Sequence, residues 1–238
     1  MPQTISFLGD IHGDFSPIYR WNTHNENSFL IQVGDFGVGF SDVTPQRLAN
    51  IDRVLGEGNN TVYVIRGNHD DPTWFNNSTK DTYTHLKFVE DDTILEILGK
   101  KILCVGGGIS LDRKFRKEGK NYWPGEPMVY DDKLESLLPN NDIDIVVTHV
   151  MSNNVHALGD SPFVREMCHD DTYLKRDMDK EQEELSKLFT TVASNIRGTW
   201  GPKERMWFYG HYHESLRNKD QYFSYVGLTI DELYTLYN

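Results

Sequence analysis

The chain has 238 residues, a formal net charge of −12 and a hydrophobic content of 38%, which is enough to bury the core of one large domain. The acidic excess argues against extended DNA or RNA as a partner, because affinity for nucleic acid comes largely from neutralising phosphates. The N-terminus lacks the basic and apolar segments of a signal peptide, and no stretch approaches the ~20 apolar residues of a membrane span. Two cysteines, Cys104 and Cys168, make no disulfide framework. We therefore expect a reduced, cytoplasmic protein with no membrane partner.

The first third of the chain predicts strands alternating with a helix. Three short runs rich in β-branched or aromatic residues predict buried strands, and they occupy residues 4–8, 28–33 and 61–65. Before the third run, Pro45 follows a possible N-cap at Thr44, and apolar residues recur at helical spacing up to residue 55. Strand, helix and strand in this order predict βαβ units.

The middle of the chain predicts antiparallel or mixed sheet. Strand candidates occupy residues 85–89, 93–98 and 101–105, with Gly99-Lys100 as a hairpin turn between the last two. A polar and aromatic loop follows up to residue 128. A short helix at 131–138 and an aliphatic strand at 142–147 come next.

The last third begins with residues 151–173, which show no clear period and predict a long loop of the kind that often serves as a lid. Residues 177–196 then predict the best helix of the chain, with Gly198 as its C-cap. Strands are expected at 206–209 and 222–226. The whole pattern predicts an α/β fold in which a sheet core is flanked by helices.

Five short motifs each follow a predicted strand and carry side chains that bind divalent metals. They are Asp10-Ile11-His12, Gly34-Asp35, Gly67-Asn68-His69-Asp70, Thr148-His149 and Gly210-His211-Tyr212-His213. Because ligands of α/β folds lie at the carboxyl ends of strands, we expect these motifs to meet in one site.

Spacing and residue type indicate the chemistry of that site. In extended chain, side chains two residues apart point the same way, as Asp10 and His12 would, or His211 and His213. Taken alone, such a pair is more often a turn aspartate and a structural histidine. Nitrogen and oxygen ligands without thiolate favour Mn, Fe, Zn, Ni or Co, and their mixture is typical of catalytic metal sites.

In this order, and over nearly the whole chain, the five motifs resemble those of the calcineurin-like metallophosphoesterase family. The resemblance implies one domain over residues 1–238, folded as a four-layer α/β/β/α sandwich of two mixed sheets flanked by helices. It also implies two divalent metal ions, with manganese favoured. One ion would be held by Asp10, His12, Asp35 and His213, and the other by Asp35, Asn68, His149 and His211.

The same resemblance implies a mechanism. A hydroxide that bridges the two metals would attack phosphorus in line, and His69, oriented by Asp70, would act as the general acid. The implied protein is a hydrolase of phosphoester bonds, either monoesters or diesters. Its substrate would be a phosphorylated small molecule, a nucleotide or a phosphoprotein.

The chain departs from one branch of the family. Ser/Thr protein phosphatases continue the second motif as Asp-Arg-Gly and end the third in Glu, whereas here Phe36 follows Asp35 and the third motif ends in Asp70. The arginine expected to grip a phosphomonoester is therefore missing from the second motif, and the subfamily stays open.

The segment from residue 106 to 126 resembles one in some bacterial and phage members of the family, with Gly-Gly, Ser110, Asp and Arg followed by Trp and Glu126. Arg113 and Arg116 lie in it, and arginine pairs bidentately with phosphate. Either Arg113 or Arg116 could therefore bind substrate, with an ordinary solvated side chain as the alternative for each. Two other functions stay open: a nucleotide or dinucleoside polyphosphate pyrophosphohydrolase, and an inactive binding module with the same fold. The second is disfavoured because every expected ligand is present.

Overall fold

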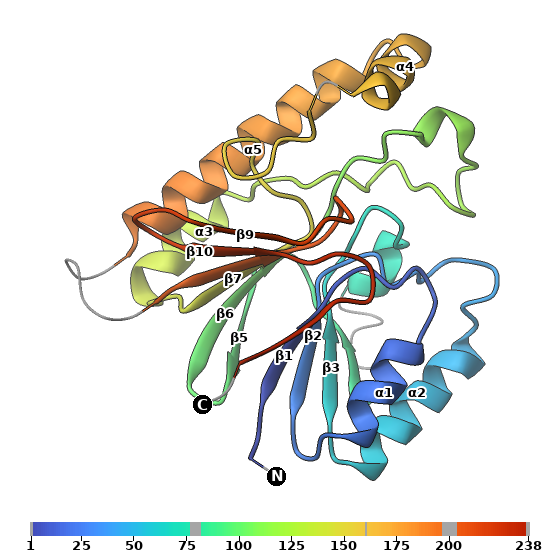
Figure 1. Cartoon of the computed structure of the whole chain (residues 1–238), viewed down its shortest axis with the longest axis vertical. Helices are drawn as coiled ribbons and strands as arrows, with labels where there is room; N and C mark the ends of the chain where they lie inside the picture. The colour runs from blue at the N-terminus through green and yellow to red at the C-terminus, as the bar shows by residue number, and fades with distance from the viewer. Residues whose placement is uncertain (1, 77–81, 160, 197–203, 237–238) are drawn as a thin grey trace.

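Two mixed β-sheets stacked face to face form the centre of the protein in its computed structural model, which describes residues 2–76, 82–159, 161–196 and 204–236. The first sheet has the strand order β11-β1-β2-β3-β4, and the second has the order β5-β6-β7-β8-β10-β9 (Figure 1). In each sheet four neighbouring strands are parallel and the remaining edge strands are antiparallel.

The strands are short. Those of the first sheet are β1 (Ile5–Leu8), β2 (Phe29–Gln32), β3 (Thr61–Val64), β4 (Leu86–Phe88) and β11 (Leu233–Leu236). Those of the second are β5 (Thr93–Ile97), β6 (Lys100–Val105), β7 (Ile145–Thr148), β8 (Met206–Tyr209), β9 (Leu216–Lys219) and β10 (Ser224–Gly227).

Helices cover the outer face of each sheet (Figure 1). Helices α1 (Ser16–Thr23) and α2 (Pro45–Glu57) pack on the first sheet, and α3 (Lys133–Leu137) and α5 (Leu174–Ser194) pack on the second. Helix α4 (Pro162–Asp170) lies at the N-terminal end of α5, and short 3₁₀ turns occupy Pro72–Phe75, Arg113–Phe115 and Leu138–Asn140. The predicted α/β fold of two mixed sheets flanked by helices is thus confirmed.

Apolar side chains from both sheets fill the space between them. Phe7 of β1 stacks on Phe208 of β8 with ring centroids 3.7 Å apart, and both rings are completely buried. Burying one such ring stabilises the fold by about 1.5–3 kcal/mol. Contacts of this kind hold the two sheets, and therefore the loops at their strand ends, in a fixed relation.

Most predicted elements are present within a few residues of their expected bounds. The N-cap at Thr44 is confirmed, since its hydroxyl accepts the Arg47 N–H at 3.3 Å. The hairpin turn lies at Leu98 and Gly99, whose φ angles are 49° and 74°, and so one residue before the predicted position.

The prediction of a structureless loop over residues 151–173 is wrong. Helix α4 occupies Pro162–Asp170 and is capped by Ser161, whose hydroxyl accepts the Val164 N–H at 3.2 Å. Only Val164 and Met167 of this helix are buried, so its apolar period is too sparse to detect. Helix α5 begins at Leu174, earlier than predicted, and the proposed cap at Gly198 lies outside the described residues.

Strand β11 joins the two ends of the described chain. It pairs antiparallel with β1, with Ile5 opposite Leu236. Beyond the pair, the Gly9 N–H donates to the Glu232 carbonyl at 2.9 Å, and the Asp231 N–H donates to the Asp10 carbonyl at 3.0 Å. The loop after β1 is therefore held from both sides. Within the described residues, no helix is both long and apolar enough to cross a bilayer.

Candidate metal centre

Loops at the carboxyl ends of parallel strands from both sheets bring the five motifs together. One group of side chains is Asp10, His12, Asp35 and His213, whose ligand atoms all lie within 4.8 Å of one another. The His12 and His213 Nε2 atoms are 3.1 Å apart, and His213 Nε2 is 3.2 Å from Asp10 Oδ2. Two carboxylates and two imidazoles converging in this way form a natural cation site.

A second group adjoins the first through Asp35. The Asn68 Oδ1 atom lies 2.9 Å from both His149 Nε2 and His211 Nδ1. One Asp35 oxygen is 3.3 Å from His149 Nε2, and the other is 3.8 Å from His12 Nδ1. Asp35 therefore lies between the two groups and presents one oxygen to each.

The backbone at four of these residues is left-handed. The φ angles are 43° at His12, 59° at Asp35, 68° at His211 and 53° at His213. Such conformations cost non-glycine residues about 1–3 kcal/mol each and gather at functional sites. The expectation that Asp10/His12 and His211/His213 lie on extended chain is wrong. Instead, turns send His213 to the first group and His211 to the second.

Glycines in the motifs make room for the carboxylates. A Cβ atom at Gly67 would collide with the Asp35 carboxylate, and one at Gly210 would collide with the Asp10 carboxylate. The two neighbouring backbones can therefore approach the acids only because these positions carry no side chain.

The buried carboxylates favour positive charge beside them. Burial by itself would lower the pKa of His149, but Asp35 and Asp10 raise it to about 9. His211 is equally buried, and burial together with the charge on His149 lowers its pKa to about 3. The two imidazoles of the second group therefore differ: His149 is held beside the negative charge of Asp35 and Asp10, whereas His211 is kept neutral.

Asp70 does not have the partners predicted for it. Its carboxylate accepts hydrogen bonds from four backbone N–H groups at 2.6–3.2 Å, those of Phe36, Gly37, Val38 and Gly67. Burial and Asp35 raise the pKa of Asp70 to about 6, while the Gly67 and Gly37 N–H groups oppose the shift. This carboxylate joins the loop after β2 to the loop after β3, and so positions Asp35 and Asn68 rather than the His69 ring.

The His69 ring lies beside Arg116 instead. Two guanidinium nitrogens of Arg116 are 2.6 and 2.9 Å from the two ring nitrogens of His69. The backbone N–H of His69 donates to one Asp35 oxygen at 2.8 Å, and the ring Nε2 is 3.9 Å from the second Asp35 oxygen. Burial, aided by Arg116 and opposed by Asp35, lowers the pKa of His69 to about 4.

Arg113 and Arg116 face different parts of the molecule. The Arg113 guanidinium donates to Asp171 at 2.6 Å and to Asp177 at 2.8 Å, which joins its loop to the α4–α5 corner. Arg116 lines the cavity of about 540 Å³ that also contains Asp35, Asn68 and His69 in its wall. Of the two arginines, Arg116 is therefore the one that lines the cavity over the cluster.

A buried hydrogen-bond chain behind Asn68 has no counterpart among the predicted roles. The Asn68 amide nitrogen donates to the Ser110 hydroxyl at 2.9 Å, which in turn donates to Glu126 Oε2 at 2.8 Å. The Ser110 N–H donates to Glu126 Oε1 at 2.7 Å. Since the amide nitrogen is held by Ser110, the amide oxygen must face His149 and His211.

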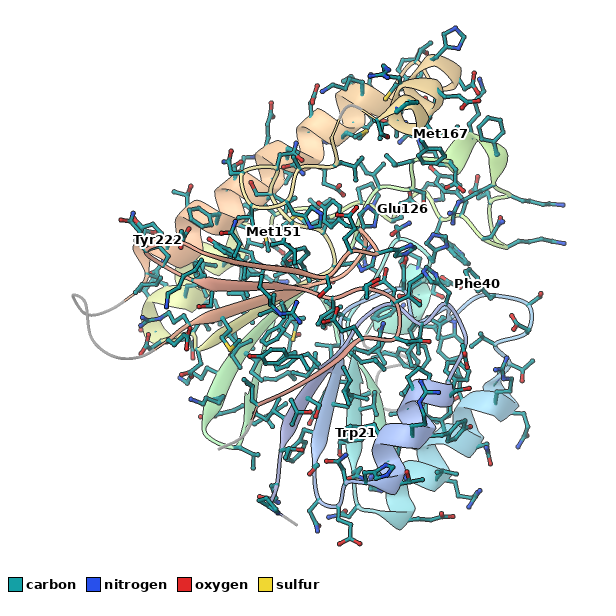
Figure 2. All side chains as sticks on the ribbon, in the orientation of Figure 1. Trp21, Phe40, Glu126, Met151, Met167 and Tyr222 are labelled. Atoms are coloured by element: carbon teal, nitrogen blue, oxygen red, sulfur yellow. The ribbon has the colours of Figure 1, made fainter. Side chains whose placement is uncertain are left out.

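Arg66 holds the far end of this hydrogen-bond chain, at Glu126. Its guanidinium donates to the carbonyls of Gly125 and Glu126 at 3.0 and 2.8 Å, and to Asp91 at 2.8 Å. Glu126 lies among the loops where the strands end (Figure 2). In the sequence, the pattern that contains Ser110 and Glu126 was the signal available for this hydrogen-bond chain. The spacing of the two residues does not show that they contact each other.

Comparison with known proteins identifies the family of the chain. The family of calcineurin-like phosphoesterases matches residues 4–215, so the chain belongs to that family. No curated protein sequence matches the chain.

Two solved structures share the fold. One is TT1561 of Thermus thermophilus, with a TM-score of 0.50, 15% identity, and coverage of 99% of this chain and 98% of that one. The other is a provisionally assigned 5′-nucleotidase from Staphylococcus aureus in complex with α-ketoglutarate, with a TM-score of 0.50 and 11% identity. That match covers 98% of this chain and 50% of the nucleotidase.

Proposed function

We propose that the protein is a metal-dependent phosphoesterase that hydrolyses a phosphomonoester or phosphodiester. The main observation in support is that Asp35 presents one oxygen to each of two adjacent groups of nitrogen and oxygen ligands. Such a carboxylate suits two cations that share a ligand, as two-metal hydrolases require. The β1–β11 pairing supports assembly of the site within one domain spanning the chain.

The donor set fits two divalent ions. Asp10, His12, Asp35 and His213 would hold one, and Asp35, Asn68, His149 and His211 the other. The absence of thiolate and the presence of several imidazoles and carboxylates suit Mn, Fe, Zn, Ni or Co, with manganese our first choice. Bound there, the ions would neutralise phosphoryl oxygens and activate water.

The chain's own residues would position the substrate and handle the proton. Arg116 would grip a phosphoryl oxygen, since guanidinium pairs well with phosphate and this one lines the cavity over the cluster. His69 would then donate a proton to the leaving oxygen. Burial and Arg116 lower the pKa of the ring, and an anionic phosphoryl oxygen bound to Arg116 would offset the guanidinium charge and so favour protonation of His69.

The first test is a substrate plate. A phosphomonoester, a phosphodiester and a dinucleoside polyphosphate are each incubated with Mn²⁺, Ni²⁺, Zn²⁺ or chelator. We expect metal-dependent release of phosphate or alcohol from at least one ester. Cleavage of the dinucleotide alone would favour a pyrophosphohydrolase, and activity in no well would favour a binding module.

The second test concerns His69. For an unactivated phosphoester, His69→Asn should lower kcat by about 10²–10⁴-fold, the usual contribution of general acid catalysis. The variant should retain both metal ions when these are measured by elemental analysis. Full kcat, or loss of the ions, would refute the assigned role.

The third test uses two arginines three residues apart as a matched pair. Arg116→Ala should raise KM about tenfold or more because it removes a charged contact to phosphate. Arg113→Ala should leave KM unchanged and lower Tm, because Arg113 is paired with Asp171 and Asp177. Equal effects of the two variants on KM would refute the assignment of the phosphate contact to Arg116 rather than Arg113.

A further inference from the structure

A cavity of about 450 Å³ lies beside the metal cluster, under helices α4 and α5. Its size is within the range of small-molecule sites. Much of its wall is apolar, including Ile109, Leu111, Val150, Val164, Met178 and the ring of Tyr212. We call this cavity the arm pocket.

The arm pocket adjoins the cavity over the cluster. The two share six wall residues, namely Leu111, Ala157, Leu158, Val164, His211 and Tyr212. His211 is also within 2.9 Å of Asn68 in the second ligand group. A molecule whose phosphoryl group lies on the cluster therefore has the arm pocket next to it.

The shared wall is held in place before any ligand binds. The Tyr212 hydroxyl donates to the Met151 carbonyl at 2.7 Å and accepts the Met151 N–H at 3.1 Å. The His156 ring stacks on Tyr212 at 4.2 Å between centroids, and His156 Nδ1 is 3.1 Å from the Tyr209 hydroxyl. A preformed wall lowers the entropic cost of ordering a ligand against it.

The charges around the arm pocket do not favour an anion. Its charged lining residues are Arg165, Lys175, Asp179 and Glu181, whose formal charges cancel. Lys175 is paired with Asp179, and the buried Glu181 accepts the Met128 N–H at 3.0 Å. A second phosphate group would find no net positive charge here, whereas an uncharged apolar group would replace water against the aliphatic wall.

We propose that the arm pocket binds the uncharged arm, aryl or branched alkyl, of a phosphoester whose phosphoryl group lies on the cluster. This rests on the proposed phosphoesterase function and narrows its substrate class. It favours an ester with one apolar arm over a polyphosphate. Leu111 and Val164, which line both cavities, would contact the first atoms of the arm, and Met178 would contact its far end.

Cys168 provides a readout that needs no turnover. It lines the arm pocket and is partly exposed, whereas Cys104 is 1% exposed. A thiol reagent applied to the folded, Mn²⁺-loaded protein should therefore modify Cys168 alone. Benzylphosphonate should slow that modification at a concentration at least tenfold lower than methylphosphonate, since only its ring reaches the arm pocket.

A matched pair of methionine variants tests the wall. Met178→Ala should weaken protection by benzylphosphonate about tenfold, in line with the loss of a few methylene groups from an apolar pocket. It should leave protection by methylphosphonate unchanged. Met206→Ala, at a partly buried position packed against the core between the sheets, should alter neither, and both variants are checked for folding by their melting curves.

The outcomes separate the two proposals. If the enzyme hydrolyses phosphoesters but both phosphonates protect Cys168 equally, the arm pocket does not bind the arm and the phosphoesterase function stands. If no ester is hydrolysed in the substrate plate, the phosphoesterase function fails whatever the labelling shows. A tenfold preference for benzylphosphonate that Met178→Ala abolishes supports the arm pocket.

Discussion

Replacing Ser110 with alanine should weaken one metal site and spare the other. Ser110 is 2% exposed, and its hydroxyl accepts from Asn68 and donates to Glu126. Without it, the buried Asn68 N–H₂ group loses its acceptor, so the amide no longer has a reason to present oxygen rather than nitrogen to His149 and His211. Leaving one buried donor unsatisfied costs about 1–3 kcal/mol.

The expected magnitude follows from that cost. Loss of a hydrogen bond behind a metal ligand typically weakens metal affinity about 10–100-fold, which corresponds to about 1.4–2.8 kcal/mol. The loss should be largest for the ion that Asp35, Asn68, His149 and His211 would hold. The ion held by Asp10, His12 and His213 should keep its wild-type Kd, because these ligands contact one another and the Ser110 hydroxyl contacts Asn68 and Glu126 instead.

Calorimetric titration of Mn²⁺ into metal-free protein measures both sites. Ser186→Ala serves as the control, because its exposed hydroxyl donates to the Gln182 carbonyl on the surface of α5. Wild-type values at both sites for Ser110→Ala would refute the reasoning. A lower Tm with unchanged Mn²⁺ affinities would show that the hydrogen bonds from Asn68 through Ser110 to Glu126 stabilise the fold but do not affect metal binding.

Two further predictions concern packing and pH. Gly67→Ala should abolish binding of at least one Mn²⁺ in the same titration, because its Cβ would collide with Asp35, whereas Gly125→Ala, whose Cβ meets only Pro72 at 3.7 Å, should bind as wild type. Asp92→Asn should raise Tm at pH 7.5 by about 3 °C and have little effect at pH 4. Burial, opposed by Lys133, raises the pKa of Asp92 to about 6 from 3.8, so between these values the unfolded chain loses a proton that the folded chain keeps, and stability falls as pH rises. An equal Tm difference at both pH values would contradict this account.

Much of the fold was predictable because its strands are nearly pure apolar runs. The residues of β1 and β7, for example, are all buried, so a short run of β-branched residues suffices to detect them. Strand β9 escaped detection because its Leu216–Lys219 sequence is mostly exposed at the edge of the second sheet. Helix α1 escaped because only Pro17, Ile18 and Trp21 are buried in it.

The meeting of the motifs was predictable, but the shape of the site was not. Each motif follows a strand, and carboxyl ends of parallel strands share an edge, so convergence follows from order along the chain. The left-handed turns at His12 and His211 could not be assigned from residue type, since only a small fraction of non-glycine residues adopt that conformation even though histidine is enriched in it. Asp70 was assigned to its sequence neighbour, whereas most of its donors come from a loop more than thirty residues earlier.

The join between β1 and β11 also governs when the centre can exist during synthesis. The loop with Asp10 and His12 leaves the ribosome early, yet it is bracketed by Asp231 and Glu232. The ligand group of Asp10 and His12 also needs the imidazole of His213. A nascent chain therefore carries carboxylates and histidines without the complete site until β11 has been synthesised. We expect metal binding to follow synthesis of that strand, because a chain cut near residue 210 lacks His213 from the first ligand group and His211 from the second.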